Sequence, residues 1–296
     1  MLLSILLEDS MKKGLVLEGG AMRGLFTAGV IDVMMENGIE FDGIIGVSAG
    51  AAFGCNYKSH QPRRAIRYNT RFSRDKRYCS WRSFIKTGDM FGAEFCYHEI
   101  PKKLDLFDFR TFEDSPEAFY LVCTDVTTGK PVYHRCRKAD DSMLEWMRAS
   151  ASMPLVSRIV ELDGRKLLDG GISDSIPLRF MEKNGYERNI VVLTQPRGYV
   201  KKPSRSADLM RVMMRKYPEF VKAAKRRHKM YNAELEYVSE AESDGRALII
   251  APEQKLPVNH VEHDPDVLRE VYRIGRNTAS AMLEDIRGFL RVKETV

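Results

Sequence analysis

Two short glycine-framed segments carry residues that could perform acyl-transfer chemistry. One is Gly19-Gly20-Ala21-Met22-Arg23-Gly24 and the other is Gly46-Val47-Ser48-Ala49-Gly50; each follows an apolar run and precedes a helical pattern. The second segment requires a strand to turn at once into a helix. Such a turn strains the backbone at Ser48 and places its hydroxyl at the tip, and the flanking glycines leave room for it. The pattern therefore predicts a serine nucleophile elbow.

The glycine-rich loop at residues 19–24 is a candidate oxyanion site. Attack by a serine hydroxyl on an ester carbonyl creates an oxyanion that needs fixed N–H donors. The backbone amide of Ala49, which follows the nucleophile, is one natural donor, and the loop can supply the others. The two segments together favour a serine acyl hydrolase.

Each segment alone has another interpretation. Ser48 could be a turn serine that caps a helix, although the strand directly before it argues against this. The loop could bind a dinucleotide, but that site expects Gly-x-Gly-x-x-Gly and an acidic residue closing the second strand. Ala21 occupies the middle glycine position, and the second strand ends in the serine elbow.

A third segment supplies a candidate base. Residues 165–168 form a short predicted strand that runs into Asp169-Gly170-Gly171, 121 residues after Ser48. That separation is too long for a local turn, so the two sites meet only if the fold brings strand ends together. Open α/β sheets do this at their carboxyl edge.

With these segments in place, the sequence resembles the patatin-like phospholipases. Their pattern is a glycine-rich loop with a basic residue, a Gly-x-Ser-x-Gly elbow, an Ala-Ser-x-x-x-Pro-like stretch and an Asp-Gly-Gly or Asp-Gly-Ala. All four occur here in order, the third as Ala-Ser-Ala-Ser-Met-Pro at residues 149–154. The resemblance runs from about Lys13 to Leu178, and more loosely to the end of the chain.

The resemblance implies roles for individual residues. Ser48 becomes the nucleophile and Asp169 its direct base, with no histidine between them. The loop at residues 19–24 and Ala49 bind the oxyanion, and neither a metal nor an organic cofactor is implied. The sequence departs from the family where Ala21 replaces a glycine and Ser175 replaces an asparagine.

A catalytic triad remains an alternative to the dyad. The unperturbed pKa of a carboxylate is about 4, far below that of a serine hydroxyl. In α/β-hydrolases a histidine takes the proton and comes last in the chain. Three of the six histidines follow Asp169, namely His228, His260 and His263. However, the elbow here follows a single earlier strand, whereas that fold places several before it.

Length and composition fit one sizeable α/β domain. With 296 residues, 44% of them hydrophobic, the chain can bury a sheet with helices on both faces. The resemblance implies a three-layer α/β/α fold with a mostly parallel sheet. We expect one hydrolase domain at residues 11–296, after an N-terminal extension at 1–10. A helical insertion at about 60–110 and a basic helical segment at about 203–242 belong to this domain.

The elements expected within this domain follow from apolar patterning. Strands are predicted at 14–18, 43–47, 119–124, 131–135, 158–162, 165–168, 190–194 and 246–250. Helices are predicted at 25–37 and 49–58, and one late helix carries apolar positions from Leu268 to Ile286 at helical spacing.

Cysteine usage and hydropathy favour a cytoplasmic protein with at most peripheral membrane contact. The five cysteines show no metal-binding spacing, and an odd number suits free thiols in a reducing compartment. The first ten residues are too short for a cleaved signal and lack a basic start. No run approaches the roughly 20 apolar residues of a membrane span.

Positive charge is concentrated in two segments. Residues 58–86 carry +9 and residues 197–229 carry +10, whereas the whole chain carries +6. The first segment interleaves Tyr68, Phe72, Tyr78, Trp81 and Phe84, a mixture suited to an anionic lipid interface. A nucleic acid would suit the same mixture, and a solvated helix face is the plainer interpretation. We expect a phospholipid or another fatty-acyl ester as partner rather than a nucleic acid.

The resemblance implies a phospholipase or lysophospholipase that forms an acyl-enzyme on Ser48. The same acyl-enzyme would serve an acyltransferase or a thioesterase. A non-catalytic lipid- or nucleotide-binding regulator with a vestigial elbow is the alternative from another class.

Overall fold

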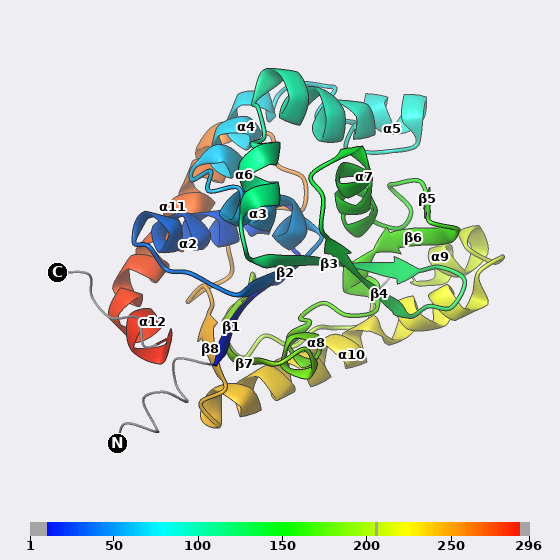
Figure 1. The fold of residues 1–296 in the computed structure, drawn as a ribbon. Coiled ribbons are helices and arrows are strands. Elements are labelled where there is room, and N and C mark those ends of the chain that lie inside the picture. Colours follow the sequence, from blue (N-terminus) through cyan, green and yellow to red (C-terminus); the bar gives the residue numbers. More distant parts are fainter. Residues whose placement is uncertain (1–10, 205–206, 291–296) are drawn as a thin grey trace.

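The fold is built on a central mixed sheet of eight strands (Figure 1). The computed structural model describes residues 11–204 and 207–290, so the expected extension at 1–10 lies outside the described part. Strands run in the order β5-β6-β3-β2-β1-β7-β8, and β4 also pairs with β3. Their bounds are β1 Lys12–Leu17, β2 Gly43–Val47, β3 Ala118–Asp125, β4 Pro131–Cys136, β5 Val160–Leu162, β6 Arg165–Asp169, β7 Tyr186–Val192 and β8 Ala247–Ile250.

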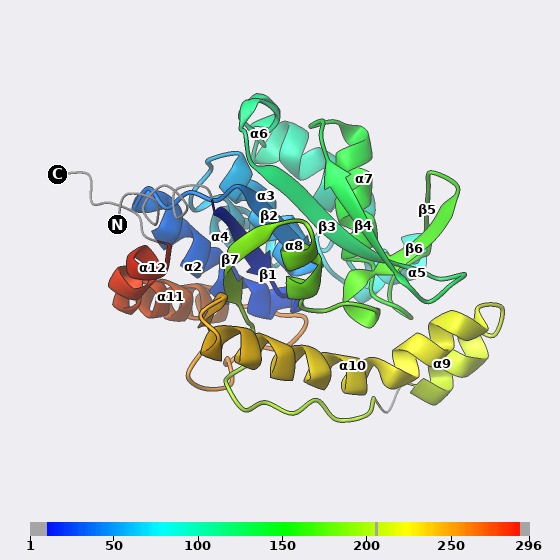
Figure 2. The ribbon, with the colours of Figure 1, turned by 60° about the horizontal axis from the view of Figure 1, so that its bottom comes forward.

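Helices cover both faces of this sheet (Figures 1 and 2). One face carries α2 (Gly24–Glu36), α3 (Ala49–Lys58), α7 (Asp141–Ser150) and α11 (Pro265–Ala281). The other face carries α8 (Leu178–Lys183) and the long α10 (Pro218–Ser243).

Each face of the sheet has its own hydrophobic core. Because side chains alternate along a strand, Leu15 and Leu17 of β1 point into the first core, whereas Val16 points into the second. Both faces of β1 and β2 are therefore apolar, as expected for parallel strands covered on both sides. This three-layer arrangement confirms the predicted α/β fold.

The segment at residues 60–110 forms short helices above the first face. These are α4 (Arg64–Phe72), α5 (Trp81–Thr87), a π-helix (Phe95–Leu104) and α6 (Phe109–Asp114). The segment lies above α3 and α7 in Figure 1.

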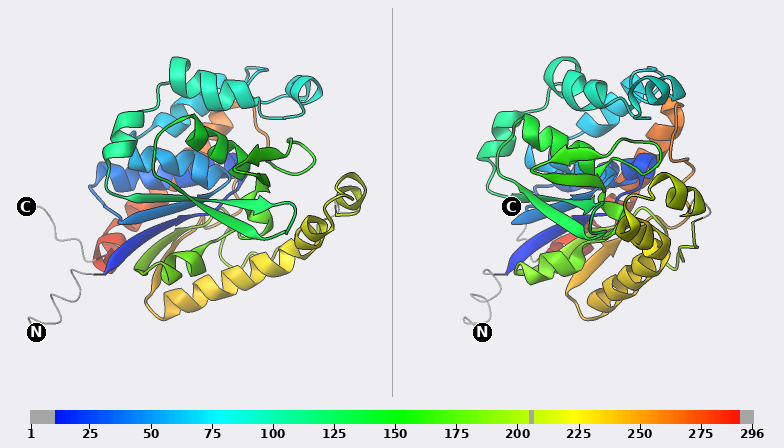
Figure 3. Two further views of the ribbon diagram at one scale, coloured as in Figure 1. Left: turned by 45° about the vertical axis from the view of Figure 1, so that its right-hand side comes forward. Right: turned by 90° about the vertical axis from the view of Figure 1, so that its right-hand side faces the viewer.

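The C-terminal part of the chain returns to the same sheet. After α9 (Ala207–Met213) and α10, β8 pairs in parallel with β7 (Figure 3). Helix α11 then packs against α2, where a β-carbon on Gly29 would overlap the backbone of Tyr272 and one on Gly275 that of Phe26. This close approach of two backbones explains the glycines at the crossing.

The structure corrects two predicted elements. Strand β7 begins at Tyr186 rather than at 190, because its polar first half pairs with the start of β1 although it has no apolar pattern. The single late helix is wrong: α11 ends at Ala281, the chain turns at Met282, and α12 (Leu283–Leu290) follows. Among the described residues, no helix has both the length and the apolar character that a membrane crossing requires.

Candidate active site

Ser48 occupies the sharp turn between β2 and α3. Its backbone adopts φ 54° and ψ −122°, and the residue is 8% exposed. A β-carbon at Gly46 would lie 2.5 Å from the Cα of Ala51, and one at Gly50 would overlap the carbonyl of Leu17. The positive φ of a non-glycine residue is strained, so the surroundings must hold the turn in place. The structure thus has the geometry of the predicted elbow.

Ser150 helps to fix the strained turn at Ser48. The backbone N–H of Ser48 donates to Ser150 Oγ at 3.0 Å, and Ser150 Oγ donates to the carbonyl of Val122 at 2.6 Å. Ser150 belongs to the Ala-Ser stretch at residues 149–154, which the sequence linked to the family pattern without giving it a role. The stretch ties the elbow to the neighbouring strand β3.

Strand β3 brings Asp169 to Ser48. Val47 at the end of β2 pairs with Val122, and Asp169 at the end of β6 pairs with Cys123, the next residue of β3. The two strand ends therefore meet, and Ser48 and Asp169 line the same cavity, where the Ser48 hydroxyl is close enough to lower the pKa of the Asp169 carboxyl. The prediction that Ser48 and Asp169 meet at the carboxyl edge of parallel strands was wrong in one respect. Strand β6 runs antiparallel to β3, so the two residues do not share such an edge.

Opposing influences set the basicity of Asp169. Burial raises its pKa above the ordinary value, whereas the hydrogen bond from Ser48, the positive charge of Arg227 and the N–H of Gly171 lower it. The Gly171 N–H lies 2.8 Å from Asp169 Oδ1, within the Gly170–Ile172 turn. Because burial dominates, Asp169 is a stronger base than an exposed carboxylate.

The predicted oxyanion loop lies against the elbow. A β-carbon on Gly19 would lie 2.9 Å from Ser48 Cβ, and one on Gly20 would lie 2.7 Å from Thr194 Oγ1. Within the part of the chain that the structure describes, the N–H groups of Gly19, Gly20 and Ala49 donate to no protein acceptor. They are available to a ligand at Ser48.

The rest of the loop forms a short 3₁₀ turn, Ala21–Arg23, that leads into α2 at Gly24. Ala21 has φ 49°, a left-handed conformation that glycine adopts without strain, so the departure from the family pattern puts strain at this residue. Met22 is buried, whereas Arg23 extends toward the loop that carries His260.

Glu18 fixes the start of this loop. Its carboxylate accepts the backbone N–H of Thr194 at 2.5 Å and the hydroxyl of Tyr231 at 2.6 Å. The Thr194 hydroxyl in turn donates to the carbonyl of Gly19 at 3.2 Å. Sequence reasoning missed these three residues because the contacts join segments more than 170 positions apart.

None of the three candidate histidines bridges Ser48 and Asp169. His263 Nδ1 lies 2.7 Å from the carbonyl of Ser73, and His228 Nδ1 lies 3.1 Å from that of Lys225. His260 Nε2 lies 3.4 Å from Arg23 Nη1. In the described residues, no group of three or more histidine, cysteine, aspartate or glutamate side chains could hold a metal ion.

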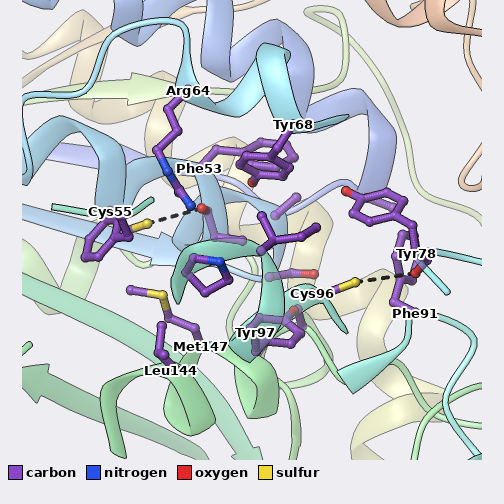
Figure 4. A pocket seen from close by; sticks show the side chains of 18 of the residues that line it. Phe53, Cys55, Arg64, Tyr68, Tyr78, Phe91, Cys96, Tyr97, Leu144 and Met147 are labelled. Atoms are coloured by element: carbon purple, nitrogen blue, oxygen red, sulfur yellow. Dashed lines mark hydrogen bonds between the residues drawn. The ribbon is translucent and has the colours of Figure 1, made fainter. Parts of the chain in front are cut away.

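Two cavities meet at Ser48. The first, of about 120 Å³, is lined mainly by aromatic and aliphatic side chains of the 60–110 segment and of α3 and α7. Figure 4 shows Phe53, Tyr68 and Tyr97 around it, with Leu144 and Met147 on another side. The second, of about 210 Å³, is polar and contains Asp169, Gly19 and Gly20. Ser48, Ala21 and Met153 line both cavities.

Two family models match parts of this chain. The family model of the patatin-like phospholipases matches residues 15–181, which include both glycine-framed segments and Asp169. The chain belongs to the patatin-like phospholipase family. A second family model, a domain of unknown function called DUF6363, matches residues 217–291. Together, the two matches cover strands of one sheet.

Curated relatives match part of this chain. The uncharacterised protein YjjU of Escherichia coli K12 is 33% identical over 192 residues, which are 62% of this chain and 52% of YjjU. The lysophospholipase NTE1 of Cryptococcus neoformans is 29% identical over 196 residues, 63% of this chain and 12% of NTE1. The chain therefore spans about half of the first relative and a small part of the second. Among solved structures, VipD of Legionella pneumophila matches 93% of this chain and 67% of its own at 10% identity, with a TM-score of 0.47.

A partly buried carboxyl pair supports the turn after Asp169. Glu234 of α10 accepts the backbone N–H of Ser175 at 3.1 Å and that of Ile176 at 3.2 Å, and it shares a hydrogen bond with Asp174. Burial and the neighbouring Asp174 raise the pKa of Glu234 to about 9. The pair therefore retains a proton at neutral pH.

This proton predicts a pH-dependent stability. The folded state keeps a proton that the unfolded chain releases near pH 4.5, so the free energy of unfolding should fall as the pH rises from about 5 to about 9. The slope of one such group is at most about 1.4 kcal/mol per pH unit. Glu234→Gln should flatten the slope in urea unfolding at pH 6 and pH 8.5. Glu236→Gln, an exposed residue of the same helix, should not; an equal effect of both substitutions would contradict the assignment.

Proposed function

We propose that this chain is a lipid acyl hydrolase that cleaves carboxylic esters of phospholipids or lysophospholipids with a Ser48–Asp169 dyad. The observation that carries the proposal is the position of a strained elbow serine beside a buried carboxylate whose pKa its hydroxyl lowers, where an apolar and a polar cavity meet. Family membership and the name of the NTE1 relatives support the substrate class.

In the proposed first step, Ser48 Oγ attacks the ester carbonyl while its proton passes to Asp169. The transfer accompanies the attack, so Asp169 never has to remove a proton from a free hydroxyl. The N–H groups of Gly19, Gly20 and Ala49 are the donors available to the oxyanion. Asp169 then protonates the departing alcohol, and the acyl group stays on Ser48.

In the second step, Asp169 takes a proton from water as the water oxygen attacks the acyl-enzyme. The Ser48 oxygen leaves and recovers the proton, and a fatty acid is released. Both steps use the same two side chains, as in other serine acyl hydrolases.

The lining of the apolar cavity is chemically suited to the acyl chain of such an ester. Among the described residues that line this cavity, Arg64 is the one cation; it is buried and pairs with Asp105 at 3.3 Å, so its charge is compensated. Tyr68 and Tyr78, which the sequence placed at a lipid interface, are buried, as is Phe72. The prediction that these three aromatic residues lie at the surface is therefore wrong, whereas Trp81 of the same segment is exposed.

A fluorophosphonate probe tests the function directly. Labelling of the wild type at Ser48, absent in Ser48→Ala, supports an activated serine. No labelling of the folded protein would instead favour a binding regulator. Product analysis with mixed phospholipids then separates hydrolysis, which releases fatty acid, from transfer to another acceptor.

We further propose that α5 and α9 contact an anionic membrane. Large apolar side chains are exposed on both helices, with Trp81 68% and Ile85 81% exposed on α5, and Leu209, Val212 and Met213 exposed on α9. Arg82, Lys86 and Arg211 lie among them. Both helices lie on the right-hand side of Figure 1. Exposed apolar residues within a basic surface are typical of interfacial binding.

Replacing Trp81 and Ile85 together with serine should weaken binding to vesicles at least tenfold, because each side chain stabilises insertion by about 1.5–3 kcal/mol. Co-sedimentation with vesicles containing anionic lipid measures this, and wild-type binding should fall with salt. Leu106→Ser, which removes an exposed apolar side chain outside both helices, is the control. Unchanged vesicle binding of the double variant would contradict the proposed membrane contact, and Trp81 and Ile85 would then be ordinary exposed residues.

A further inference from the structure

The polar cavity beside Ser48 gathers basic side chains from four separate segments. Arg23 comes from the oxyanion loop, Lys201 from the connection after β7, Arg227 from α10, and His260 from the loop before α11. Lys201, Arg227 and His260 all lie beyond the patatin match, and the last two lie within the domain of unknown function. The C-terminal part thus forms one side of the site.

Three of these basic side chains lack anionic partners within residues 11–204 and 207–290, the ranges that the structure describes. Among the described residues, Arg23, Lys201 and Arg227 form no ion pair with a carboxylate. The Nε of Arg23 is buried and has no hydrogen-bond partner within that part of the chain. Buried donors of a charged group normally have a hydrogen-bond acceptor, so we expect the N–H at Arg23 Nε to donate to a ligand.

The other two cations leave room for an acceptor. Arg227 Nε donates to the carbonyl of Gly171, and Lys201 Nζ lies 4.5 Å from the centre of the Tyr231 ring. The two carboxylates of the cavity, Glu18 and Asp169, are buried and already accept hydrogen bonds from protein groups. The donors of the cavity therefore exceed its free acceptors.

The electrostatics of the cavity agree with this imbalance. Burial, together with the positive charges of Arg227 and Arg23, lowers the pKa of Lys201 to about 8, although Glu18 acts in the opposite direction. Burial also lowers the pKa of His260, with added effects of Arg23, Lys201 and Arg227. The cations repel one another, and a bound anion would relieve the repulsion.

We infer that this cavity binds a phosphate group on the alcohol part of the substrate, so that the C-terminal segment selects phosphate-bearing esters over neutral ones. The inference rests on the proposed hydrolase function. Because Ser48 lines both cavities, an ester held there can direct its acyl chain into the apolar cavity and its alcohol into the polar one. A phosphate offers several oxygens to donors that converge from different segments, and arginine and lysine are its usual partners.

The test compares two esters that differ in the phosphate. Palmitoyl lysophosphatidate and monopalmitoylglycerol are supplied in the same neutral detergent micelles, and kcat/KM is measured for each. Lys201→Met should lower the ratio of the two values at least tenfold, the usual effect of losing a charge-assisted hydrogen bond. Lys202→Met removes the same charge from the exposed neighbour and should leave the ratio unchanged. Lys201 is preferred to Arg227 because Arg227 also acts on Asp169.

A binding experiment separates the headgroup from free phosphate and does not require catalysis. Calorimetric titration of Ser48→Ala with lysophosphatidate, and separately with inorganic phosphate, should show tighter binding of the lipid, weakened by adding Lys201→Met. Equal affinity for the two ligands would overturn a headgroup site, as would an unchanged kcat/KM ratio in Lys201→Met. If the wild type hydrolyses neither ester and resists the fluorophosphonate, the proposed function fails, whereas the titration still decides the phosphate site.

Discussion

Asp169→Asn is expected to lower kcat/KM on a short-chain ester about as much as Ser48→Ala does, roughly 10⁴-fold or more. The two residues act as one unit, so the loss of either removes the same proton transfer. Asparagine keeps an oxygen that can accept the N–H of Gly171, so the turn after β6 should persist. Circular dichroism and thermal unfolding check that both variants fold.

Two histidine variants are the controls for this prediction. His228→Ala and His263→Ala should retain most activity, because these side chains contact the carbonyls of Lys225 and Ser73 and not the dyad. A loss in His260→Ala as large as that in Asp169→Asn would restore the triad. The pH profile adds a second readout: since burial raises the pKa of Asp169, the acidic limb of kcat/KM should lie above pH 3.8, the ordinary value of the carboxyl.

The parallel part of the sheet could be predicted because its strands are buried on both faces. Such strands read as continuous apolar runs, and β2 has the predicted bounds. The direction of β6 could not be predicted in the same way. The pattern of residues 165–168 predicts a strand. However, nothing in that short pattern specifies that β6 pairs antiparallel with β3. The meeting of Ser48 and Asp169 depends on that register.

The interleaved aromatic residues show where local reasoning was incomplete. Ala65, Tyr68 and Phe72 recur at helical spacing, which marks a buried stripe on α4. The prediction considered only the arginines around these aromatic residues and therefore placed them at the surface. The helical period was therefore the signal that could have located the wall of the apolar cavity.

The polar cavity had no comparable local signal. Arg23, Lys201 and Arg227 are spread over more than 200 positions, and a count of charge cannot tell a cation in a cavity from one in solvent. Sequence reasoning identified the basic segment at 197–229 without assigning a contact to the active site. Only the packing of α10 along the second face of the sheet brings Arg227 to the Gly170–Ile172 turn.

Gly20→Ala is expected to lower kcat about 10²–10³-fold, the usual effect of losing one oxyanion donor. The added β-carbon would lie 2.7 Å from Thr194 Oγ1 and 3.1 Å from Thr194 Cβ, so the loop must move away from β7. Thr194 is itself held through its N–H by the Glu18 carboxylate, which limits how far it can yield. A displaced loop no longer directs the N–H groups of Gly19 and Gly20 at the oxyanion.

Thr194→Ala in the Gly20→Ala background distinguishes a displaced loop from general damage. It removes the hydroxyl nearest to the new β-carbon and should restore part of kcat, even though Thr194→Ala alone loses the hydrogen bond to the Gly19 carbonyl. Burst kinetics with an activated ester place the effect on acylation or deacylation, and KM should change less than kcat. A folded Gly20→Ala variant with normal turnover would show that the Gly20 N–H does not bind the oxyanion, and the donors would then be Gly19 and Ala49 alone.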